Sequence, residues 1–302
     1  MITKAAKYCH VVFADAINLS RRPVDHAPQA EEIGYQLESH PSFNLDEQTF
    51  VRWVLRRAGI DAEHYRRETL ARRLPACLRV LRAASLSHAR FMIERNDELL
   101  HEAVSALIIG VTQFFRDAPV FDALRDVVLP RISQHPHVRI WSVGCSDGSE
   151  LYSVAILLAE MRALHRCSLL GTDCRAEAMR QAVEGRFCGA ALAAVPDRMR
   201  EHHFSPDPIN DGSHSYKARP FLCSSMRWRC ANVLDAVEPG PWDLILCRNM
   251  SMYLRPEASG RLWKSLQSEL RPGGYLVLGR AERPHGVDSL SIASPGVYRR
   301  GN

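Results

Sequence analysis

The stretch "WSVGCSDGSELYSVA", residues 141–155, joins an apolar run to a glycine-containing break and then to a helical pattern. The apolar run predicts a strand, and we expect the helix to begin at about Glu150. Gly144 and Gly148 let a backbone approach a ligand closely, and a helix N-terminus offers unpaired N–H groups. Ligands of open α/β sheets bind at the carboxyl ends of the strands. The stretch therefore predicts a ligand-binding turn in an α/β protein.

Short apolar runs recur on the carboxyl-terminal side of this stretch, with helical stretches between them. They are "SLLGTD" (168–173), "MRWRCANVL" (226–234), "DLILCRN" (243–249) and "GGYLVLG" (273–279). Strands that alternate with helices predict a mostly parallel sheet with helices on both faces. The domain boundary is expected near residue 135.

The preceding part of the chain has a different pattern. From Leu45 to about Leu107, apolar residues recur three and four positions apart, which predicts helices. Residues 1–41 show weak periodicity and are expected to form a partly ordered lead-in. Thr112 is expected to cap the next turn, and Pro130 is expected to stop the helix that follows.

Composition excludes several classes of protein. With 46% hydrophobic and 24% charged residues and no run of 18 apolar residues, the chain is expected to be globular and cytoplasmic, without membrane insertion. Its nine cysteines include no Cys-x-x-Cys, which supports neither a disulfide framework nor a zinc site. A net charge of +5 does not indicate nucleic acid. The six arginines between residues 66 and 82 form either a solvated helix face or a surface for an acidic partner.

Polar residues end the later strands. Asp173 ends the second predicted strand, where an acidic residue typically holds the ribose hydroxyls of a nucleoside; the alternative is that it caps the next helix. Asn232 and Asn249 follow two further predicted strands. The loop at Gly144 lacks both Gly-x-Gly-x-x-Gly and a Lys-Ser/Thr ending. S-adenosylmethionine is therefore favoured over NAD or ATP.

The motifs resemble a known family. "VTQFFRD", "WSVGCSDGSELYS", "GTD", "NVLD", "DLILCRNMSMYL" and "LRPGGYLVLGRAE" occur in the order and spacing of CheR-type chemotaxis methyltransferases. The similarity spans roughly residues 43–299. It implies an all-helical N-terminal domain and a Rossmann-like domain that transfers a methyl group from S-adenosylmethionine to receptor glutamates, leaving S-adenosylhomocysteine.

The resemblance also implies the site. Its catalytic residues would be Arg116 and Tyr253. Its cofactor residues would be Thr112, Gly144, Asp147, Gly148, Glu150, Asp173, Asn232, Val233, Asn249 and Met250. Because Ser149 replaces one of two acidic residues of the family loop, either Glu150 or Asp147 is expected to meet the amino group of the cofactor. Arg175 stands where the family usually has an aspartate.

The expected division of the chain is a lead-in (1–41), a helical domain (42–116), a linker helix (117–135) and a methyltransferase domain (136–302). Residues 186–230 occupy the place of the family's small antiparallel subdomain, with a hairpin turn expected at Asp211-Gly212. Nearby His202, His203 and His214 are expected on the surface, and no metal site is expected.

A carboxylate acceptor is already ionised at neutral pH, so methyl transfer to it requires alignment and removal of water but no general base. The leading hypothesis is therefore methylation of glutamates on an acidic chemoreceptor helix. Two alternatives stay open: a same-fold enzyme acting on a small or carrier-bound carboxylic acid, and a non-catalytic cofactor-sensing module. The sequence leaves the oligomeric state undecided.

Overall fold

The computed structural model describes residues 43–108, 110–207 and 215–301. The expected lead-in, the Asp211-Gly212 turn and His214 lie outside these residues. Within them, no helix is both long enough and apolar enough to cross a membrane.

The amino-terminal part is all-helical, as predicted. Asn44 begins the first helix with a capping box, because its side chain accepts from Glu47 N while Glu47 accepts from Asn44 N, both at 2.9 Å. Buried apolar faces join the helices into one core. The elements are α2 (Leu45–Arg57), η2 (Ala62–His64), α3 (Arg67–Leu81), α4 (Leu86–Arg95) and α5 (Asp97–Leu107).

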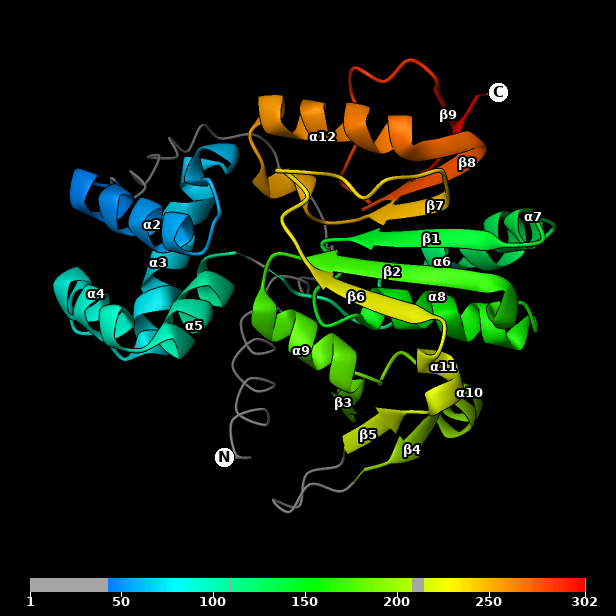
Figure 1. Cartoon of the computed structure of the whole chain (residues 1–302), viewed down its shortest axis with the longest axis horizontal. Coiled ribbons are helices and arrows are strands. Elements are labelled where there is room, and N and C mark those ends of the chain that lie inside the picture. The colour runs from blue at the N-terminus through cyan, green and yellow to red at the C-terminus, as the bar shows by residue number, and fades with distance from the viewer. Residues whose placement is uncertain (1–42, 109, 208–214, 302) are drawn as a thin grey trace, which may run out of the picture.

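The carboxyl-terminal part contains a seven-stranded sheet in the order β6-β2-β1-β7-β8-β10-β9 (Figure 1). The first five strands in this order are parallel, and β10 is antiparallel to both of its neighbours. The predicted parallel sheet is therefore confirmed. Its strands are β1 (Val138–Val143), β2 (Cys167–Asp173), β6 (Met226–Cys230), β7 (Trp242–Cys247), β8 (Leu270–Leu278), β9 (Leu290–Ser294) and β10 (Val297–Arg300).

Alternating residues of the strands face two different cores. Trp141 packs with α12 (Pro256–Glu269), and its neighbour Ile140 packs with α8 (Ser149–Glu160) on the other face. A third helix, α9 (Ala176–Glu184), lies against β2 and β6. Helices therefore cover both faces of the sheet, as the alternating pattern predicts.

The segment between the two parts corrects two expectations. Thr112 does not begin a helix, because α6 (Ala118–Ala123) begins after Asp117, a residue with φ 61°. Pro130 does not stop a helix but lies in the first turn of α7 (Leu129–Ile132), which continues a π-helical turn at Leu124–Val128. The chain is already helical when it reaches Pro130, because α6, the π-helical turn and α7 follow one another without a break.

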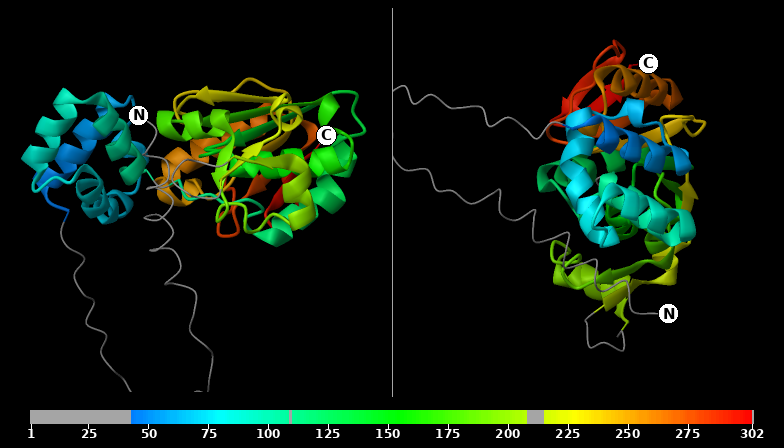
Figure 2. Two further views of the ribbon diagram at one scale, coloured as in Figure 1. Left: turned by 90° about the horizontal axis from the view of Figure 1, so that it is seen from below. Right: turned by 90° about the vertical axis from the view of Figure 1, so that its left-hand side faces the viewer.

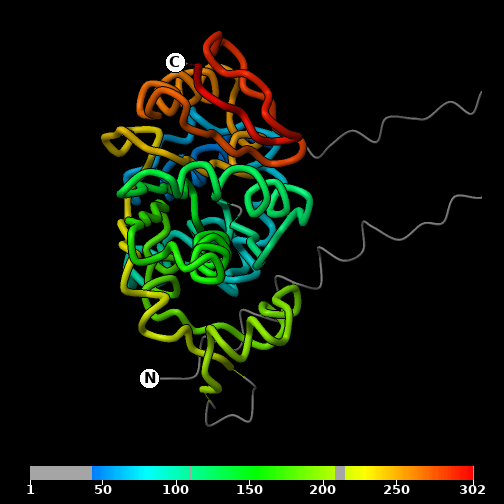
Figure 3. Tube along the Cα trace, turned by 90° about the vertical axis from the view of Figure 1, so that its right-hand side faces the viewer, coloured from blue at the N-terminus to red at the C-terminus, as the bar shows by residue number. Residues whose placement is uncertain are grey.

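A small antiparallel sheet in the order β3-β5-β4 projects from the end of the molecule opposite α12 (Figure 3). Its strands are β3 (Arg186–Cys188), β4 (Phe204–Pro206) and β5 (Ser215–Ala218), accompanied by α10 (Asp197–His203) and α11 (Pro220–Cys223). This agrees with the antiparallel subdomain that the resemblance implies.

The helical domain forms a lobe beyond the carboxyl ends of the parallel strands (Figures 1 and 2). Residues 64–66 run along residues 253–255 like a short antiparallel strand. Arg66 N donates to Tyr253 O, and Arg255 N donates to His64 O, each at 2.9 Å. The lobe is thus attached to the turn that follows β7, which includes the 3-10 turn η5 (Ser251–Tyr253).

Candidate active site

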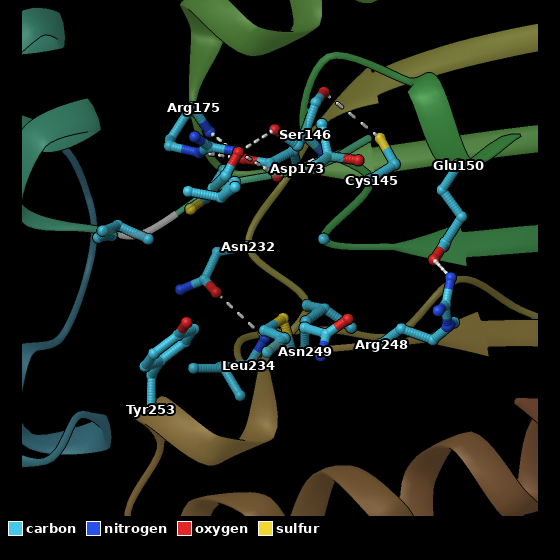
Figure 4. A pocket seen from close by; sticks show the side chains of 18 of the residues that line it. Cys145, Ser146, Glu150, Asp173, Arg175, Asn232, Leu234, Arg248, Asn249 and Tyr253 are labelled. Atoms are coloured by element: carbon cyan, nitrogen blue, oxygen red, sulfur yellow. Dashed lines mark hydrogen bonds and ion pairs between the residues drawn. The ribbon is translucent and has the colours of Figure 1, made fainter. Parts of the chain in front are cut away.

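A pocket lies between the carboxyl ends of the parallel strands and the helical domain (Figure 4). It encloses about 970 Å³ of empty space, with open solvent at its mouth included. Turns after β1, β2, β6 and β7 line it, together with Tyr65, Thr69, Leu107 and Ile108 of the helical domain. The pocket is therefore built by both parts of the chain.

The structure brings most of the expected site residues to this pocket. Both expected catalytic residues, Arg116 and Tyr253, line it. The expected cofactor residues that line it are Thr112, Gly144, Glu150, Asp173, Asn232, Val233, Asn249 and Met250.

Asp147 and Gly148, the two remaining expected cofactor residues, are not among the residues that line the pocket. Asp147 holds the start of α8, because its Oδ1 accepts from Ser149 N at 2.9 Å and from Ser149 Oγ at 2.7 Å. Gly148 has φ +87°, and a Cβ there would lie 2.6 Å from the Trp228 ring. Of the two carboxylates considered for the cofactor's amino group, only that of Glu150 lines the pocket.

The turn after β1 depends on Gly144. This residue has φ +64°, and a Cβ added to it would lie 2.9 Å from the sulfur of Met250. Glycine therefore allows both the left-handed backbone and the close approach of the turn after β7. Two of the expected cofactor residues meet at this point.

Asp173, at the end of β2, lies in the pocket wall and does not cap α9, whose N-cap residue is Arg175 and has no side-chain capping bond. Its carboxylate lines the pocket, and Oδ1 also accepts from Arg175 N at 2.9 Å, just ahead of α9. Oδ2 accepts from Ser146 N at 2.9 Å, which joins the turn after β1 to the end of β2. The Arg175 side chain forms a buried ion pair with the same carboxylate.

Asn232 has an unused donor. Its Oδ1 accepts from Leu234 N at 3.2 Å, whereas Nδ2 is buried and has no partner among the described residues. A buried amide without a partner is unfavourable, and ring nitrogens of a purine are suitable acceptors. This orphaned donor in the pocket wall fits a nucleoside cofactor.

Arg248 is a functional candidate that the sequence reasoning missed. Its side chain is 2% exposed and pairs with Glu150 at 3.1 Å and with Asp117 at 2.8 Å. It also donates to the backbone oxygen of Arg116 at 2.6 Å. Because Phe115 and Asp117 both have positive φ, Arg116 lies on a strained turn, and Arg248 holds that turn in place.

Glu282 is a second functional candidate that the sequence reasoning missed. This carboxylate is 3% exposed and accepts from the backbone N–H groups of Asn249, Met250, Ser251 and Gly279 and from Ser251 Oγ, at 2.7–3.0 Å. Asn249 has φ +56°, so the turn carrying it needs external support. Its signal in the sequence is the "GRAE" block at residues 279–282, which is part of the motif that carries the family resemblance.

Tyr65 brings the helical domain into the pocket. Its side chain is buried, and burial raises its pKa well above the ordinary value, with Cys174 and Asp173 adding to the shift. Tyr65 therefore stays protonated at neutral pH. No local motif marks it, because the groups that shift its pKa, Cys174 and Asp173, are more than a hundred residues away in sequence.

Away from the pocket, Glu160 meets His202 and His203, and their potential ligand atoms lie within 4.8 Å of one another. His203 is fully buried, and its Nε2 lies 2.8 Å from Glu160 Oε1. Burial lowers the pKa of His203, although the hydrogen bond to Glu160 opposes that shift. His203 is therefore buried, which corrects the expectation that it lies on the surface. The absence of a metal stays a prediction.

Comparison with known proteins shows that the sheet domain is an S-adenosylmethionine-binding domain. Residues 110–294 match the family model of the CheR methyltransferase S-adenosylmethionine-binding domain, and residues 46–108 match that of the CheR methyltransferase all-alpha domain. A chemotaxis protein methyltransferase of Listeria monocytogenes is 29% identical over 248 residues, covering 80% of this chain and 92% of that protein. One of Vibrio parahaemolyticus is 29% identical over 260 residues, covering 82% and 94%.

Proposed function

Because this chain belongs to the CheR methyltransferase family, and so is an S-adenosylmethionine-dependent methyltransferase, we propose that it methylates glutamate side chains of a chemoreceptor. The names of its relatives support a receptor as the acceptor. One observation carries the proposal: Arg116 and Tyr253 line the same pocket as Asp173, Asn232 and Asn249. Acceptor-side and cofactor-side residues therefore share one cavity.

We assign the cofactor to the side of the pocket formed by the strand ends. Asn232 Nδ2 would donate to the adenine, and Asn249 and Met250 would line the site where Glu282 holds their backbone. Asp173 would hold the ribose. The chemistry that S-adenosylmethionine supplies there is an electrophilic methyl group on sulfur.

The residues around the acceptor fit a carboxylate. The Arg116 guanidinium donates to Val111 O at 2.6 Å and keeps other N–H groups for an anion. Tyr253 would align the acceptor, since the helical domain holds its backbone oxygen. No histidine is among the pocket-lining residues of the described chain, and an ionised carboxylate needs no base.

Tyr253→Phe and Arg116→Ala test these roles. With tritiated S-adenosylmethionine and a receptor cytoplasmic fragment, each variant should transfer label at least about tenfold more slowly, which corresponds to about 1.4 kcal/mol of transition-state stabilisation. The affinity for S-adenosylhomocysteine and the circular dichroism spectrum should stay close to those of the parent chain. Normal turnover in both variants would remove them from the site.

The acceptor class is tested in the same assay. Small carboxylic acids replace the receptor fragment, and the label is counted in the protein and in the small-molecule fraction. We expect transfer to the protein. Transfer to small acids alone would support the same-fold enzyme of small-molecule metabolism, and transfer to neither would support a cofactor-sensing module.

A further inference from the structure

The Asp173 carboxylate has no hydrogen-bonding capacity left. An ionised carboxylate offers about four lone-pair positions, two on each oxygen. Oδ1 accepts from Arg175 N at 2.9 Å and from Arg175 Nε at 3.0 Å. Oδ2 accepts from Ser146 N at 2.9 Å and from Arg175 Nη2 at 3.1 Å. Four donors thus fill all four positions.

These donors are of two kinds. The N–H groups of Ser146 and Arg175 belong to the backbone, and they orient the carboxylate from the turns after β1 and β2. The other two belong to the guanidinium of Arg175, which meets one lone pair of each oxygen as a fork (Figure 4). A ribose diol held by an aspartate would use the same two positions, because it presents two O–H donors side by side. The guanidinium therefore takes the place of the diol.

The surroundings of Arg175 favour this arrangement. The residue is 8% exposed and lines the pocket. A Cβ on Gly110 would lie 1.8 Å from Arg175 Nη1, so glycine at this position makes room for the guanidinium. Burial alone would lower the pKa of Arg175, but the charge and hydrogen bonds of Asp173 raise it above the ordinary value. Arg175 therefore stays protonated at neutral pH.

We propose that Arg175 determines cofactor affinity as an internal competitor of the ribose, and that its guanidinium must leave Asp173 before the ribose diol can bind there. The proposal rests on the assignment of the ribose to Asp173 within the proposed function. The fraction of molecules with Arg175 displaced then scales the apparent affinity, since the apparent Kd equals the intrinsic Kd divided by that fraction. Arg175 therefore raises the cofactor concentration needed for half occupancy above that of a free Asp173, without changing the hyperbolic shape of the binding curve.

The test is the affinity of S-adenosylhomocysteine for Arg175→Met, measured by isothermal titration calorimetry. Methionine keeps an unbranched stem but has no fork. Coupling between two binding events typically changes affinity roughly 5- to 150-fold. We expect S-adenosylhomocysteine to bind Arg175→Met more tightly by a factor in that range. The control is Arg180→Met, because Arg180 lies on α9, the helix that Arg175 precedes, and is exposed and pairs with Glu177 instead.

A second substitution shows where the gain arises. Adding Asp173→Asn to Arg175→Met should cancel the tighter binding, since the carboxylate that the diol would hold is gone. If Arg175→Met does not fold by circular dichroism, Arg175→Lys serves in its place, because it keeps the charge but not the fork. Its affinity should lie between those of the parent chain and the expected value for methionine.

The outcomes separate the two ideas. Unchanged or weaker binding by a folded Arg175 variant overturns the competition, and weaker binding would make Arg175 itself a ribose contact. If Asp173→Asn leaves the tighter binding intact, the gain does not arise at Asp173 and the proposal fails. If the parent chain and every variant fail to bind S-adenosylhomocysteine, the cofactor assignment falls together with the inference.

Discussion

At the scale of single residues, Glu282 has the densest set of hydrogen bonds in the site. Glu282→Gln would turn one acceptor oxygen into an NH₂ group that faces at least two N–H donors. Because each buried donor left without a partner costs about 1–3 kcal/mol, we expect a loss of roughly 2–4 kcal/mol in the free energy of unfolding, measured by urea denaturation. S-adenosylhomocysteine should also bind more weakly, since Asn249 and Met250 line the pocket.

Glu257→Gln is the matched control for this prediction. Glu257 is exposed on α12, so its variant should keep both the stability and the affinity of the parent chain. Equal stability of the two variants would show that the turn after β7 does not need the buried carboxylate.

The sequence predicted which residues line the pocket where those residues directly follow a strand. Asp173, Asn232 and Asn249 each follow a strand, and the parallel topology brings such residues together. Arg248 and Glu282 serve other residues instead of a ligand. Their partners lie up to 132 and 33 residues away, so no local spacing revealed them. Asp147 shows the opposite difficulty. Its partner, Ser149, is two residues away, and the same short stretch of sequence is compatible both with this bond at the start of α8 and with the expected contact to the cofactor.

At the scale of elements, strands were predicted better than the boundaries of irregular segments. The runs that became β1, β2, β7 and β8 are largely apolar because both faces of a central parallel strand are buried, whereas β6, at the edge of the sheet, is buried only at Met226. The helix boundaries predicted at Thr112 and Pro130 were wrong. At Pro130 the reason is that proline occurs both in the first turn of a helix and after a helix end. Its neighbours in the fold, not its own sequence, decide between these outcomes.

The contact between α8 and α10 gives a prediction about pH. The pKa of His203 lies below its ordinary value in the folded chain, so above about pH 6.5 the imidazole is neutral in both the folded and the unfolded chain. As the pH falls below that value, the unfolded chain takes up a proton first, and folding loses stability until the folded pKa is passed. The melting temperature should therefore fall less for His203→Gln than for the parent chain between about pH 7.5 and about pH 5.5.

His202→Gln provides the comparison, because His202 is the exposed neighbour on the same helix. Its melting temperature should follow the parent chain over the same pH range. An equal pH dependence of His203→Gln and the parent chain would contradict the role assigned to the buried imidazole.

At the scale of the whole molecule, the arginines of residues 66–82 divide into two groups. Arg66 Nε donates to Leu254 O, and Arg73 Nε donates to Ala106 O, each at 2.9 Å. These two are structural, which revises the expectation of a uniform basic face. Arg72 and Arg79 are exposed, lie two turns apart on one face of α3, and form no ion pair within the described residues. We therefore restrict the proposed surface for an acidic receptor helix to Arg72 and Arg79; the alternative is that they form a solvated face of α3.

Salt dependence separates the two groups. Arg72→Ala/Arg79→Ala should lower kcat/KM on a receptor fragment several-fold at low salt, because opposite charges speed encounter. The loss should shrink near 1 M salt, where the Debye length is about 3 Å. Arg66→Ala should instead lower kcat equally at both salt concentrations, because it removes the side-chain hydrogen bond to Leu254 O, next to Tyr253, while the backbone bond from Arg66 N to Tyr253 O stays.

Arg227→Ala/Arg261→Ala removes the same charge from exposed positions outside α3 and controls for net charge. It should keep the parent rate. A loss equal to that of Arg72→Ala/Arg79→Ala would mean that total charge, and not the face of α3, attracts the receptor.

The most direct test of the proposed function is the chemical position of the transferred methyl group. A receptor cytoplasmic fragment is incubated with this chain and S-adenosylmethionine, digested and sequenced by tandem mass spectrometry. The proposal predicts a methyl ester on glutamate side chains that mild base removes as methanol. A base-stable methyl group on nitrogen, or an unmodified receptor beside a methylated small acid, would contradict it.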